Sequence, residues 1–341
     1  MTTTVTYRRA VLRGPGQLAV EDADLGPPAA GELLVAPDAV GICGTDLELL
    51  DGSMAYLQQG LAEYPIVPGH EWTGRVVAVG PDVTGFATGD RVVGECTVSC
   101  GACERCADPA GYHLCAARTE AGIMRRPGGL ATRLLFPARA AHRVPSHVDA
   151  RDAALVEPLA VAYRGVERLL PAGGADVCVV GAGTIGLLCA LVAEALGAPR
   201  VHLVDPDEGR RDRATALGFE ASTTPPRVPC VVEASGTAEG IRTAVGSTTE
   251  GGRVLLLGLT GAPAVPLDVD AVVLRDLTVV GSLGSPSVWP AAVDLVASGR
   301  IAPGRLVSHE FGLGRVADAY QRAIDRKPGT HKVLVRPQEV T

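Results

Sequence analysis

The sequence contains few aromatic residues and almost no lysine. Only 4% of its 341 residues are Phe, Trp or Tyr, which argues against a surface that stacks nucleic-acid bases. Lysine occurs only at Lys327 and Lys332, so nearly all of the 31 formal cations are arginines. With 38 acidic residues the net charge is −7, which excludes the basic surface that nucleic acid or an anionic membrane attracts. We therefore expect neither nucleic acid nor a membrane as a partner.

The sequence also lacks a long apolar run without breaks. The uncharged stretch 177–193 approaches the length of a membrane-spanning helix, but Gly181, Gly183 and Gly186 interrupt it. A buried strand followed by a buried helix fits this pattern better. Residues 1–13 lack the apolar segment of a signal peptide, and we therefore expect a cytoplasmic protein.

The pattern of predicted elements changes near residue 150, and the length is that of about two domains. Before this point, short alternating segments between Gly and Pro turns predict strands, with one short helix over 45–50. After it, apolar strands alternate with helices, at 176–180, 184–196, 200–205 and 207–217. This alternation predicts an α/β domain with a parallel sheet covered on both faces.

A glycine-rich segment, GAGTIG over 181–186, follows one of these strands and begins the next helix. Its first glycine permits a tight turn, its second lets a pyrophosphate approach the backbone, and its third lets helix and strand pack closely. The helix N-terminus favours the negative charge of the phosphates. The pattern predicts a dinucleotide site rather than a turn of structural use only, with these residues as its contacts: Gly181, Gly183, Thr184, Ile185 and Gly186.

Asp205, at the end of the following predicted strand, bears on the choice of cofactor. A carboxylate there can bind both ribose hydroxyls of NAD and repels the 2′-phosphate of NADP. Asp207 and Glu208 add to this repulsion, whereas Arg210 and Arg211 partly counter it. We predict NAD as the cofactor, with NADP less favoured.

Five of the nine cysteines fall between Cys96 and Cys115, and four of them have the spacing of a metal site. Four thiolates on one loop can close a tetrahedron around zinc and leave no position for a substrate, which defines a structural site. The alternatives are a redox CxxC pair or a loop without metal. The predicted ligands are Cys100, Cys103, Cys106 and Cys115.

A second, dispersed set of metal-binding residue types consists of Cys43, His70, Glu71 and Glu157. Cysteine, histidine and glutamate can hold zinc with one position open for a substrate. Their spacing alone does not establish such a site, because each residue also fits an ordinary structural role.

Taken together, the motifs resemble those of the zinc-dependent medium-chain alcohol and polyol dehydrogenases. The landmarks occur in the family's order along nearly the whole chain: GICGTD at 41–46, GHEWTG at 69–74, GDRV at 89–92, the four cysteines, VEPLAVA at 156–162, GAGTIG at 181–186 and SHEFGL at 308–313. The resemblance implies a GroES-like catalytic domain over 1–150, completed by about 290–341, and a Rossmann NAD-binding domain over 151–289.

The resemblance also implies roles for individual residues. Cys43, His70 and Glu71, with Glu157 as a ligand or water-holding carboxylate, would bind a catalytic zinc, giving two zinc ions per chain. Asp46 would accept a hydrogen bond from the His70 ring. Thr45 would take the proton of the substrate hydroxyl, while the hydride passes to the nicotinamide.

The sequence departs from the family pattern at several places. Glu48 stands where the family has its relay histidine, so the proton would leave through Glu48, water or the ribose. Cys115, the fourth cysteine of the predicted structural zinc site, comes one residue later after Cys106 than is usual in the family. Only a short stretch separates Leu217 from Cys230, where the family has a further helix, so the sheet lacks one covering crossover there.

The substrate implied by the resemblance is a polyol, a sugar or an aminocyclitol with a secondary alcohol. The sequences of residues 64–74, 99–106, 157–162, 233–236 and 307–313 are similar to those of the 2-deoxy-scyllo-inosamine dehydrogenases of aminoglycoside biosynthesis. A pocket bordered by Glu48, Glu95 and Glu157 would suit such a ring. The alternatives are a glucose, threonine or simple alcohol dehydrogenase, a ketone reductase, or a non-enzymatic NAD-binding protein.

The family resemblance also implies a homodimer or homotetramer, paired through the strand 277–283.

Overall fold

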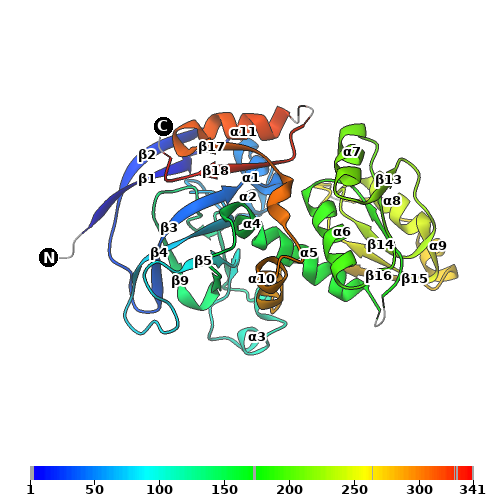
Figure 1. Cartoon of the computed structure of the whole chain (residues 1–341), viewed down its shortest axis with the longest axis horizontal. Coiled ribbons are helices and arrows are strands. Elements are labelled where there is room, and N and C mark those ends of the chain that lie inside the picture. Colours follow the sequence, from blue (N-terminus) through cyan, green and yellow to red (C-terminus); the bar gives the residue numbers. More distant parts are fainter. Residues whose placement is uncertain (1–3, 172–173, 263, 326, 328, 340–341) are drawn as a thin grey trace. The chain divides into compact units, whose positions relative to one another are not determined.

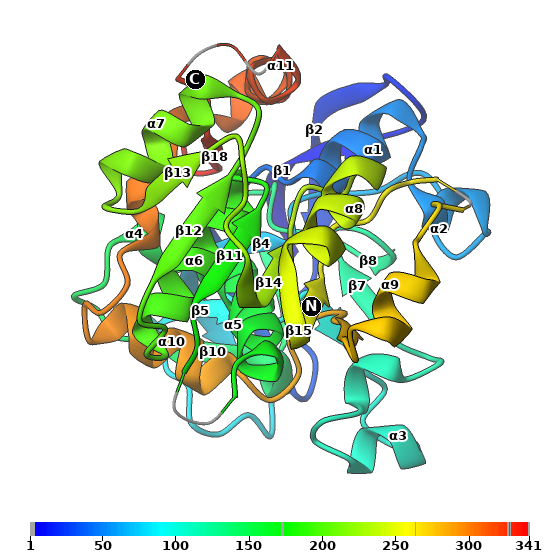
Figure 2. The same ribbon diagram turned by 90° about the vertical axis from the view of Figure 1, so that its right-hand side faces the viewer.

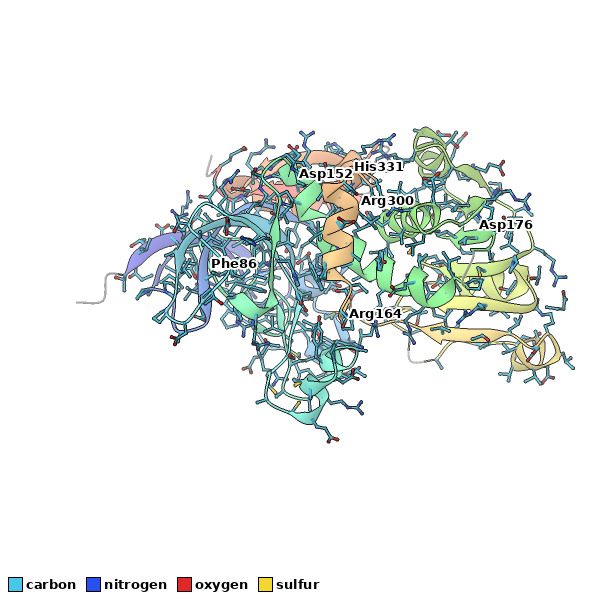
Figure 3. All side chains as sticks on the ribbon, turned by 60° about the horizontal axis from the view of Figure 1, so that its bottom comes forward. Phe86, Asp152, Arg164, Asp176, Arg300 and His331 are labelled. Carbon is cyan, nitrogen blue, oxygen red and sulfur yellow. The ribbon has the colours of Figure 1, made fainter. Side chains whose placement is uncertain are left out.

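The computed structural model describes residues 4–171, 174–262, 264–325, 327 and 329–339. Its contacts divide the chain into two units, one made of Met1–Glu157 and Trp289–Thr341 and the other of Pro158–Val288. The first unit extends beyond residue 150 because α4 (Ala150–Ala154) packs on its sheet. Asp152 of α4, which is labelled in Figure 3, also accepts a hydrogen bond of 2.7 Å from the backbone N–H of Gly304.

The first unit is built on a seven-stranded sheet (Figure 1). The strand order is β10 (Ala141–Val144), β5 (Arg91–Gly94), β4 (Glu71–Val79), β3 (Glu32–Gly41), β18 (Lys332–Arg336) and β17 (Val307–Gly312), and β9 (Leu134–Pro137) also pairs with β3. Strand β18 runs antiparallel to β3, with Leu334 opposite Gly41. Strand β18 therefore lies beside the strand that leads to Cys43.

Apolar packing fixes this sheet. Trp72 of β4 and Phe136 of β9 meet edge to face, with ring centroids 4.9 Å apart. Both rings are almost completely buried, and they fill the space above Gly94, where a Cβ atom would lie 2.1 Å from the Trp72 ring. A side chain at position 94 would force these rings apart, so the core requires glycine there.

Smaller elements complete the first unit. Strands β1 (Val5–Leu12) and β2 (Leu18–Leu25) form a hairpin, and β6 (Thr97–Val98), β7 (Thr119–Ala121) and β8 (Arg125–Arg126) form a three-stranded sheet. The helical elements used below are α1 (Gly44–Asp51), α2 (Ala55–Gln58), α3 (Glu104–Ala107), η1 (Tyr112–Leu114), α10 (Trp289–Ala297), η3 (Pro303–Leu306) and α11 (Val316–Asp325).

The second unit contains a six-stranded, entirely parallel sheet, and Figure 2 shows its central strands side by side. Its order is β13 (Glu220–Ser222), β12 (Val201–Val204), β11 (Val177–Val180), β14 (Val228–Glu233), β15 (Thr248–Leu256) and β16 (Thr278–Gly281). The chain winds outward from β11 through β12 to β13 and then returns to β14 on the other side of β11. Ligands of such sheets bind at this switch point, beyond the carboxyl ends of the strands.

Helices α6 (Thr184–Ala195), α7 (Glu208–Ala216), α8 (Ala238–Ser247) and α9 (Val269–Leu274) belong to the second unit. No helix lies between β13 and β14, so the short stretch before Cys230 leaves out a crossover helix as the sequence predicts. Residues 177–193 form β11 and most of α6. Among the described residues, no helix has the length and apolar character needed to cross a membrane.

Helix α5 (Val156–Leu169) has no counterpart among the predicted elements. It begins at the end of the first unit and continues into the second, whose first residue is Pro158. Proline is tolerated in the first turn of a helix, because the N–H groups there have no partner within the helix.

Candidate functional site

Cys43 lies at the junction of β3 and α1. It is the N-cap of α1, and the Asp46 carboxylate accepts a hydrogen bond of 2.8 Å from its backbone N–H. Asp46 is completely buried and also accepts a bond of 3.3 Å from the N–H of Gly69. One carboxylate therefore fixes the backbone beside both Cys43 and His70.

Pairing between β3 and β4 brings the other two candidate ligands to Cys43. Glu71, the first residue of β4, lies opposite Gly41 of β3. Gly41 is two residues before Cys43, and His70 directly precedes Glu71. Gly69 has φ +98°, a conformation that favours glycine and turns the chain into β4. The sheet register thus joins residues that are 27 positions apart, Cys43 and His70, in one place.

Lys332 on β18 is a member of this site that the sequence reasoning missed. Its ammonium contacts the Glu71 carboxylate and donates a hydrogen bond of 3.0 Å to the carbonyl oxygen of Ile42. Burial lowers the pKa of Lys332, but Glu71, Cys43 and Asp46 outweigh it and raise the pKa above its usual value. The feature that could have indicated its role is the position of Lys332, one of two lysines in the sequence, at the start of an apolar strand.

Gly41 makes room for this ion pair. A Cβ atom at position 41 would lie 2.0 Å from a Glu71 carboxylate oxygen and 2.9 Å from the Lys332 Cε. The first glycine of the GICGTD motif is therefore required by the side chains of the site, since its own φ is not in the left-handed region.

The donor set fits a divalent metal such as zinc. One ligand atom each of Cys43, His70 and Glu71 lies within 4.8 Å of the others, and they supply sulfur, nitrogen and oxygen. Glu71 is already paired with Lys332, and a divalent cation would supply the positive charge that a Cys43 thiolate at this site requires.

Asp46 and Glu157 lie next to this group without joining it. The His70 Nδ1 is 3.7 Å from Asp46 Oδ1, too far for the predicted hydrogen bond, because the carboxylate is engaged by backbone N–H groups. Glu157, in the first turn of α5, is outside the cluster of three candidate ligands. Burial raises the pKa of Glu157 to about 7, with Glu71 adding to the shift and His70 opposing it, so Glu157 lies within electrostatic range of the cluster.

Thr45 and Glu48 lie on the first two turns of α1, three positions apart, which places them on one face of the helix. Both are half-buried. Burial, reinforced by Asp51, raises the pKa of Glu48 above its usual range.

Glu95, which the sequence analysis places at the border of the substrate pocket, has both carboxylate oxygens engaged within the protein. Its two carboxylate oxygens bind the Tyr112 hydroxyl at 2.5 Å and His142 Nε2 at 2.9 Å. The His142 ring in turn stacks on Trp289 at 5.2 Å. Glu95 therefore fastens the cysteine-containing loop to the core and has both oxygens engaged within the protein.

The four cysteines of this loop gather at a single point. Their Sγ atoms are 3.5 Å apart for Cys103 and Cys106, 3.7 Å for Cys103 and Cys115, and 3.7 Å for Cys100 and Cys106. Zn–S bonds of about 2.3 Å in a tetrahedron place the sulfur atoms about 3.8 Å apart, so this arrangement fits zinc without rearrangement. Cys96 is not part of the group.

The glycines of 181–186 occupy the positions that a phosphate-binding turn needs. Gly181 has φ +99°, and a Cβ there would lie 2.7 Å from the backbone N of Ser235. A Cβ on Gly186 would lie 1.8 Å from the carbonyl oxygen of Gly181. Gly183, the N-cap of α6, has open space around its Cβ position, where a phosphate can approach.

Asp205 follows β12 and ties this turn to the next helix. Its carboxylate accepts hydrogen bonds of 2.8 Å from the N–H of Ala182 and 2.9 Å from that of Asp207, and it pairs with Arg210 at 3.3 Å. Arg211 donates to the Asp205 carbonyl at 2.9 Å. The charge that would select the cofactor is thus held in place and partly neutralised by one arginine.

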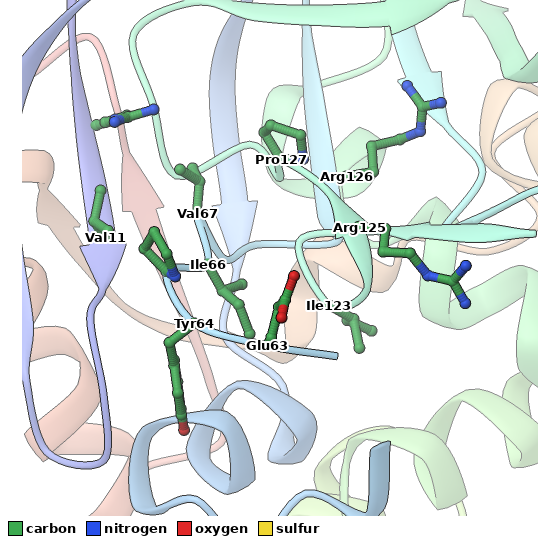
Figure 4. Close-up of a pocket in the computed structure, with 11 residues that line it drawn as sticks. Val11, Glu63, Tyr64, Ile66, Val67, Ile123, Arg125, Arg126 and Pro127 are labelled. Carbon is green, nitrogen blue, oxygen red and sulfur yellow. The ribbon is translucent and has the colours of Figure 1, made fainter. Parts of the chain in front are cut away.

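A separate cavity of about 270 Å³ lies between the segments 63–67 and 123–127 (Figure 4). Arg9 and Val11 complete its lining. None of the candidate metal or cofactor residues lines this cavity, so it is a feature distinct from the site described above.

Comparison with known proteins agrees with this geometry. Residues 29–146 match the alcohol dehydrogenase GroES-like domain, and residues 184–298 match the zinc-binding dehydrogenase family. The sorbitol dehydrogenase of Bombyx mori is 30% identical over 347 residues, covering 96% of this chain and 98% of that protein.

Two solved structures are similar over nearly the whole chain. A protein of Sinorhizobium meliloti 1021 described as a zinc-binding dehydrogenase, bound to NADP, has a TM-score of 0.88 and 31% identity, covering 98% of this chain and all of that one. A protein of E. coli CFT073 named as an alcohol dehydrogenase, in complex with NADH, has a TM-score of 0.89 and 26% identity, covering 97% of this chain and 99% of that one.

The fold and site thus define a zinc-binding oxidoreductase with a GroES-like and a Rossmann domain. More closely, the chain belongs to the medium-chain alcohol and polyol dehydrogenase family, whose members oxidise CH–OH groups.

Proposed function

We propose that this enzyme oxidises a secondary alcohol of a polyol, sugar or aminocyclitol to a ketone and transfers the hydride to NAD. The observation that carries this proposal is the meeting of the half-buried Cys43 with the buried His70 and Glu71, whose carboxylate is paired with Lys332. Such a set holds a metal while leaving a position for substrate, in contrast to the four-cysteine loop, where no position is left.

Two zinc ions per chain are proposed, one on the four cysteines and one on Cys43, His70 and Glu71. Zinc at the second site supplies Lewis-acid chemistry, lowering the pKa of an alcohol. Glu157 is proposed as a fourth ligand or as a carboxylate that orients a water molecule there, and its electrostatic interaction with His70 supports this.

Thr45 is proposed to take the hydroxyl proton of the substrate, because it lies two residues from Cys43 at the start of α1. Glu48, on the same face of α1, is positioned to receive that proton and release it to solvent, in place of a relay histidine. Bound NAD would supply the hydride acceptor, so that oxidation of the alcohol would give a ketone, NADH and one proton.

NAD is the proposed cofactor, bound by Gly181, Gly183, Thr184, Ile185, Gly186 and Asp205. The carboxylate of Asp205 supports NAD over NADP because it would repel a 2′-phosphate. The two structural relatives bind NADP in one case and NADH in the other, so both cofactors need to be assayed.

Among substrates, the likeness to sorbitol dehydrogenase supports a polyol. The motifs shared with 2-deoxy-scyllo-inosamine dehydrogenases support an aminocyclitol of aminoglycoside biosynthesis. L-threonine is a second candidate, because the L-threonine 3-dehydrogenase of Coxiella burnetii is 30% identical over 89% of this chain.

We also propose a homodimer or homotetramer in the cytoplasm. Strand β16 is paired only with β15 and leaves one edge of its sheet open within the described part of the chain. The nine cysteines form no disulfide, which suits a reducing compartment that keeps thiolates available for zinc.

The test is NADH formation by the purified, zinc-loaded protein with aminocyclitols, inositols, hexitols, aldoses, threonine and simple alcohols. A clear preference for a polyhydroxylated substrate is the expected result. Turnover of threonine alone would favour the second candidate. Reduction of ketones with no oxidation of any alcohol would overturn the proposed direction.

A further inference from the structure

Glu233 is a completely buried carboxylate that the proposed mechanism does not use. It is the last residue of β14, level with Val180 of β11 and Leu256 of β15 in the parallel sheet. Its Oε2 atom is buried and has no hydrogen-bond partner among the described residues. Such an atom costs free energy, so its presence at the carboxyl end of the sheet requires an explanation.

The β14 turn, residues 234–237 between β14 and α8, is organised by the Glu233 carboxylate. Glu233 Oε1 accepts hydrogen bonds from the backbone N–H of Ser235 at 2.8 Å and of Gly236 at 3.0 Å, and from the Ser235 hydroxyl at 2.5 Å. The Ser235 hydroxyl in turn accepts a bond of 3.2 Å from the N–H of Thr237, the N-cap of α8. One oxygen atom therefore fixes the course of the chain from the end of β14 to the start of α8.

Two neighbouring segments are packed against the β14 turn at distances that admit no side chain. On the side of β11, a Cβ atom on Gly181 would lie 2.7 Å from the backbone N of Ser235. On the side of β15, a Cβ atom on Gly258 would lie 2.2 Å from the backbone N of Gly236 and 2.8 Å from Glu233 Oε2. The β14 turn is thus enclosed between the glycine-rich segment after β11 and the segment after β15.

These three segments form the edge at which the cofactor is proposed to bind. They follow the carboxyl ends of β11, β14 and β15, and ligands of doubly wound sheets bind beyond such ends. Gly181 begins the glycine-rich segment that is proposed to receive the pyrophosphate. Because Gly181 contacts the β14 turn without an intervening side chain, a displacement of that turn would change the shape of the glycine-rich segment.

We propose that Glu233 is a positioning residue for the dinucleotide, whose Oε1 atom holds the β14 turn beside Gly181 before the cofactor binds. A site that already has its bound shape loses no binding free energy to ordering. The role requires an acceptor oxygen at the reach of a glutamate side chain rather than a negative charge, because Oε1 receives every described hydrogen bond of this side chain. This inference rests on the proposed function, in which the segment at Gly181 binds NAD.

The test measures binding of NAD and of NADP, by calorimetry and without substrate, to the full-length, zinc-loaded protein. Glu233→Gln keeps an acceptor oxygen at the same reach, whereas Glu233→Met has a similar length and no such acceptor. Thr248→Val is the matched control, because Thr248 is also completely buried and donates a hydrogen bond of 2.8 Å to the carbonyl oxygen of Ala244. Thr248 lies opposite Val228, at the other end of the β14–β15 pair. Tm and zinc content are recorded for each protein.

We expect Glu233→Met to weaken NAD binding about tenfold, or about 1.4 kcal/mol, and Glu233→Gln to stay within about twofold of the unmodified protein. Methionine leaves the N–H groups of Ser235 and Gly236 without their acceptor, so the β14 turn loses its fixed shape. Thr248→Val should lower Tm and leave the Kd of NAD unchanged. With the alcohol that the unmodified enzyme oxidises, Glu233→Met should raise KM for NAD and keep most of kcat at saturating NAD.

Hydrogen exchange on the unmodified protein gives a second measurement, which stands even if Glu233→Met does not fold. Without cofactor, the N–H groups of Ser235 and Gly236 should exchange slowly, because both are bonded to Glu233. Exchange as fast as that of an exposed loop, becoming slow only when NAD binds, would mean that the cofactor orders the turn. That result would overturn the inference.

The remaining outcomes are also decisive. An unchanged Kd of NAD in Glu233→Met, with or without a lower Tm, would show a purely structural role and overturn the inference, while the proposed function would stand. A loss of NAD binding in Glu233→Gln equal to that in Glu233→Met would make the negative charge the required feature, which also overturns the inference. If the unmodified protein binds neither NAD nor NADP, the proposed function fails and this inference fails with it.

Discussion

At the scale of single residues, the candidate metal centre depends on one buried ion pair. Glu71 is 1% exposed and Lys332 3%, so both charges are removed from water and each requires the other. The same pair explains why Gly41 has no side chain, and it joins the last strand of the chain to the first catalytic motif. A lysine that is one of only two in the sequence is thus placed where a positive charge is needed.

Replacing this lysine tests the arrangement. Lys332→Met should lower the stability of the metal-free protein by about 3–5 kcal/mol, because it leaves a buried carboxylate without its partner. Lys327→Met is the matched control, since Lys327 pairs at the surface with Asp325 and its side chain is 63% exposed. Thermal unfolding of both variants measures the difference, and equal Tm values would contradict the role given to the buried pair.

A second prediction at this scale concerns the cofactor. Asp205→Asn should raise the kcat/KM ratio of NADP to NAD by about tenfold or more, because it removes the charge opposed to a 2′-phosphate while keeping an acceptor for the N–H of Ala182. Asp176→Asn is the control, as Asp176 pairs with Arg200 elsewhere in the same unit. A ratio that Asp205→Asn does not change would remove Asp205 from the basis of selectivity.

At the scale of elements, the loop that carries the four cysteines has little apolar core of its own. Helix α3 has no buried residue, and Cys100 and Cys103 are exposed. The loop is held by Cys115, by the contacts of Glu95 with Tyr112 and His142, and, as proposed, by zinc. Metal binding can therefore supply folding free energy that the packing of such a segment does not provide.

Cysteine replacement separates this proposal from a loop without metal. Cys103→Ser should reduce the zinc content from two ions per chain to one and lower Tm, because one of four thiolate ligands is lost. Cys96→Ser removes a nearby thiol outside the cluster and should retain both ions. Metal analysis of the two purified variants distinguishes them, and an unaltered zinc content in Cys103→Ser would contradict a structural site.

Elements with a strong local pattern could be predicted, and those defined by long-range pairing could not. Strand β11 and helix α6 follow from an apolar run, a glycine turn and a second apolar run. Helix α5 was missed because Pro158 in its first turn resembles a break. The partnership of Lys332 with Glu71 depends on the register of β18 against β3, and nothing local in the sequence specifies that register.

The same distinction applies to the candidate site. The four cysteines of the predicted structural zinc site could be grouped from their spacing, because they lie on one loop of 16 residues, 100–115. Cys43 and His70 could be joined only through family resemblance, and the antiparallel pairing of β3 with β4 supplies the physical reason that they meet. The hydrogen bonds of Glu95 to Tyr112 and His142 could not be predicted, because these partners are 17 and 47 positions away in the sequence.

At the scale of the whole molecule, the second unit has an exposed apolar surface next to an open sheet edge. In α9, Val269, Val273 and Leu274 are 60%, 69% and 84% exposed, and Leu259 is 80% exposed. Strand β16, which follows α9 in the chain, pairs on one side only within the described residues. Apolar side chains rarely gather at the surface of a monomer, and an unpaired strand edge invites pairing with another chain.

This surface predicts the contact through which two copies associate. Leu274→Asp should shift the protein toward monomers at micromolar concentration, because it places a charge where an apolar side chain would be covered. Ile324→Asp on α11 is the control, since Ile324 is 46% exposed in the first unit and far from β16 along the chain. Sedimentation velocity gives the mass of each species, and circular dichroism checks that both variants fold. A monomeric unmodified protein, or equal dissociation by the two substitutions, would contradict pairing through β16. The expected result, dissociation by Leu274→Asp but not by Ile324→Asp, would identify the surface of α9 as part of the interface.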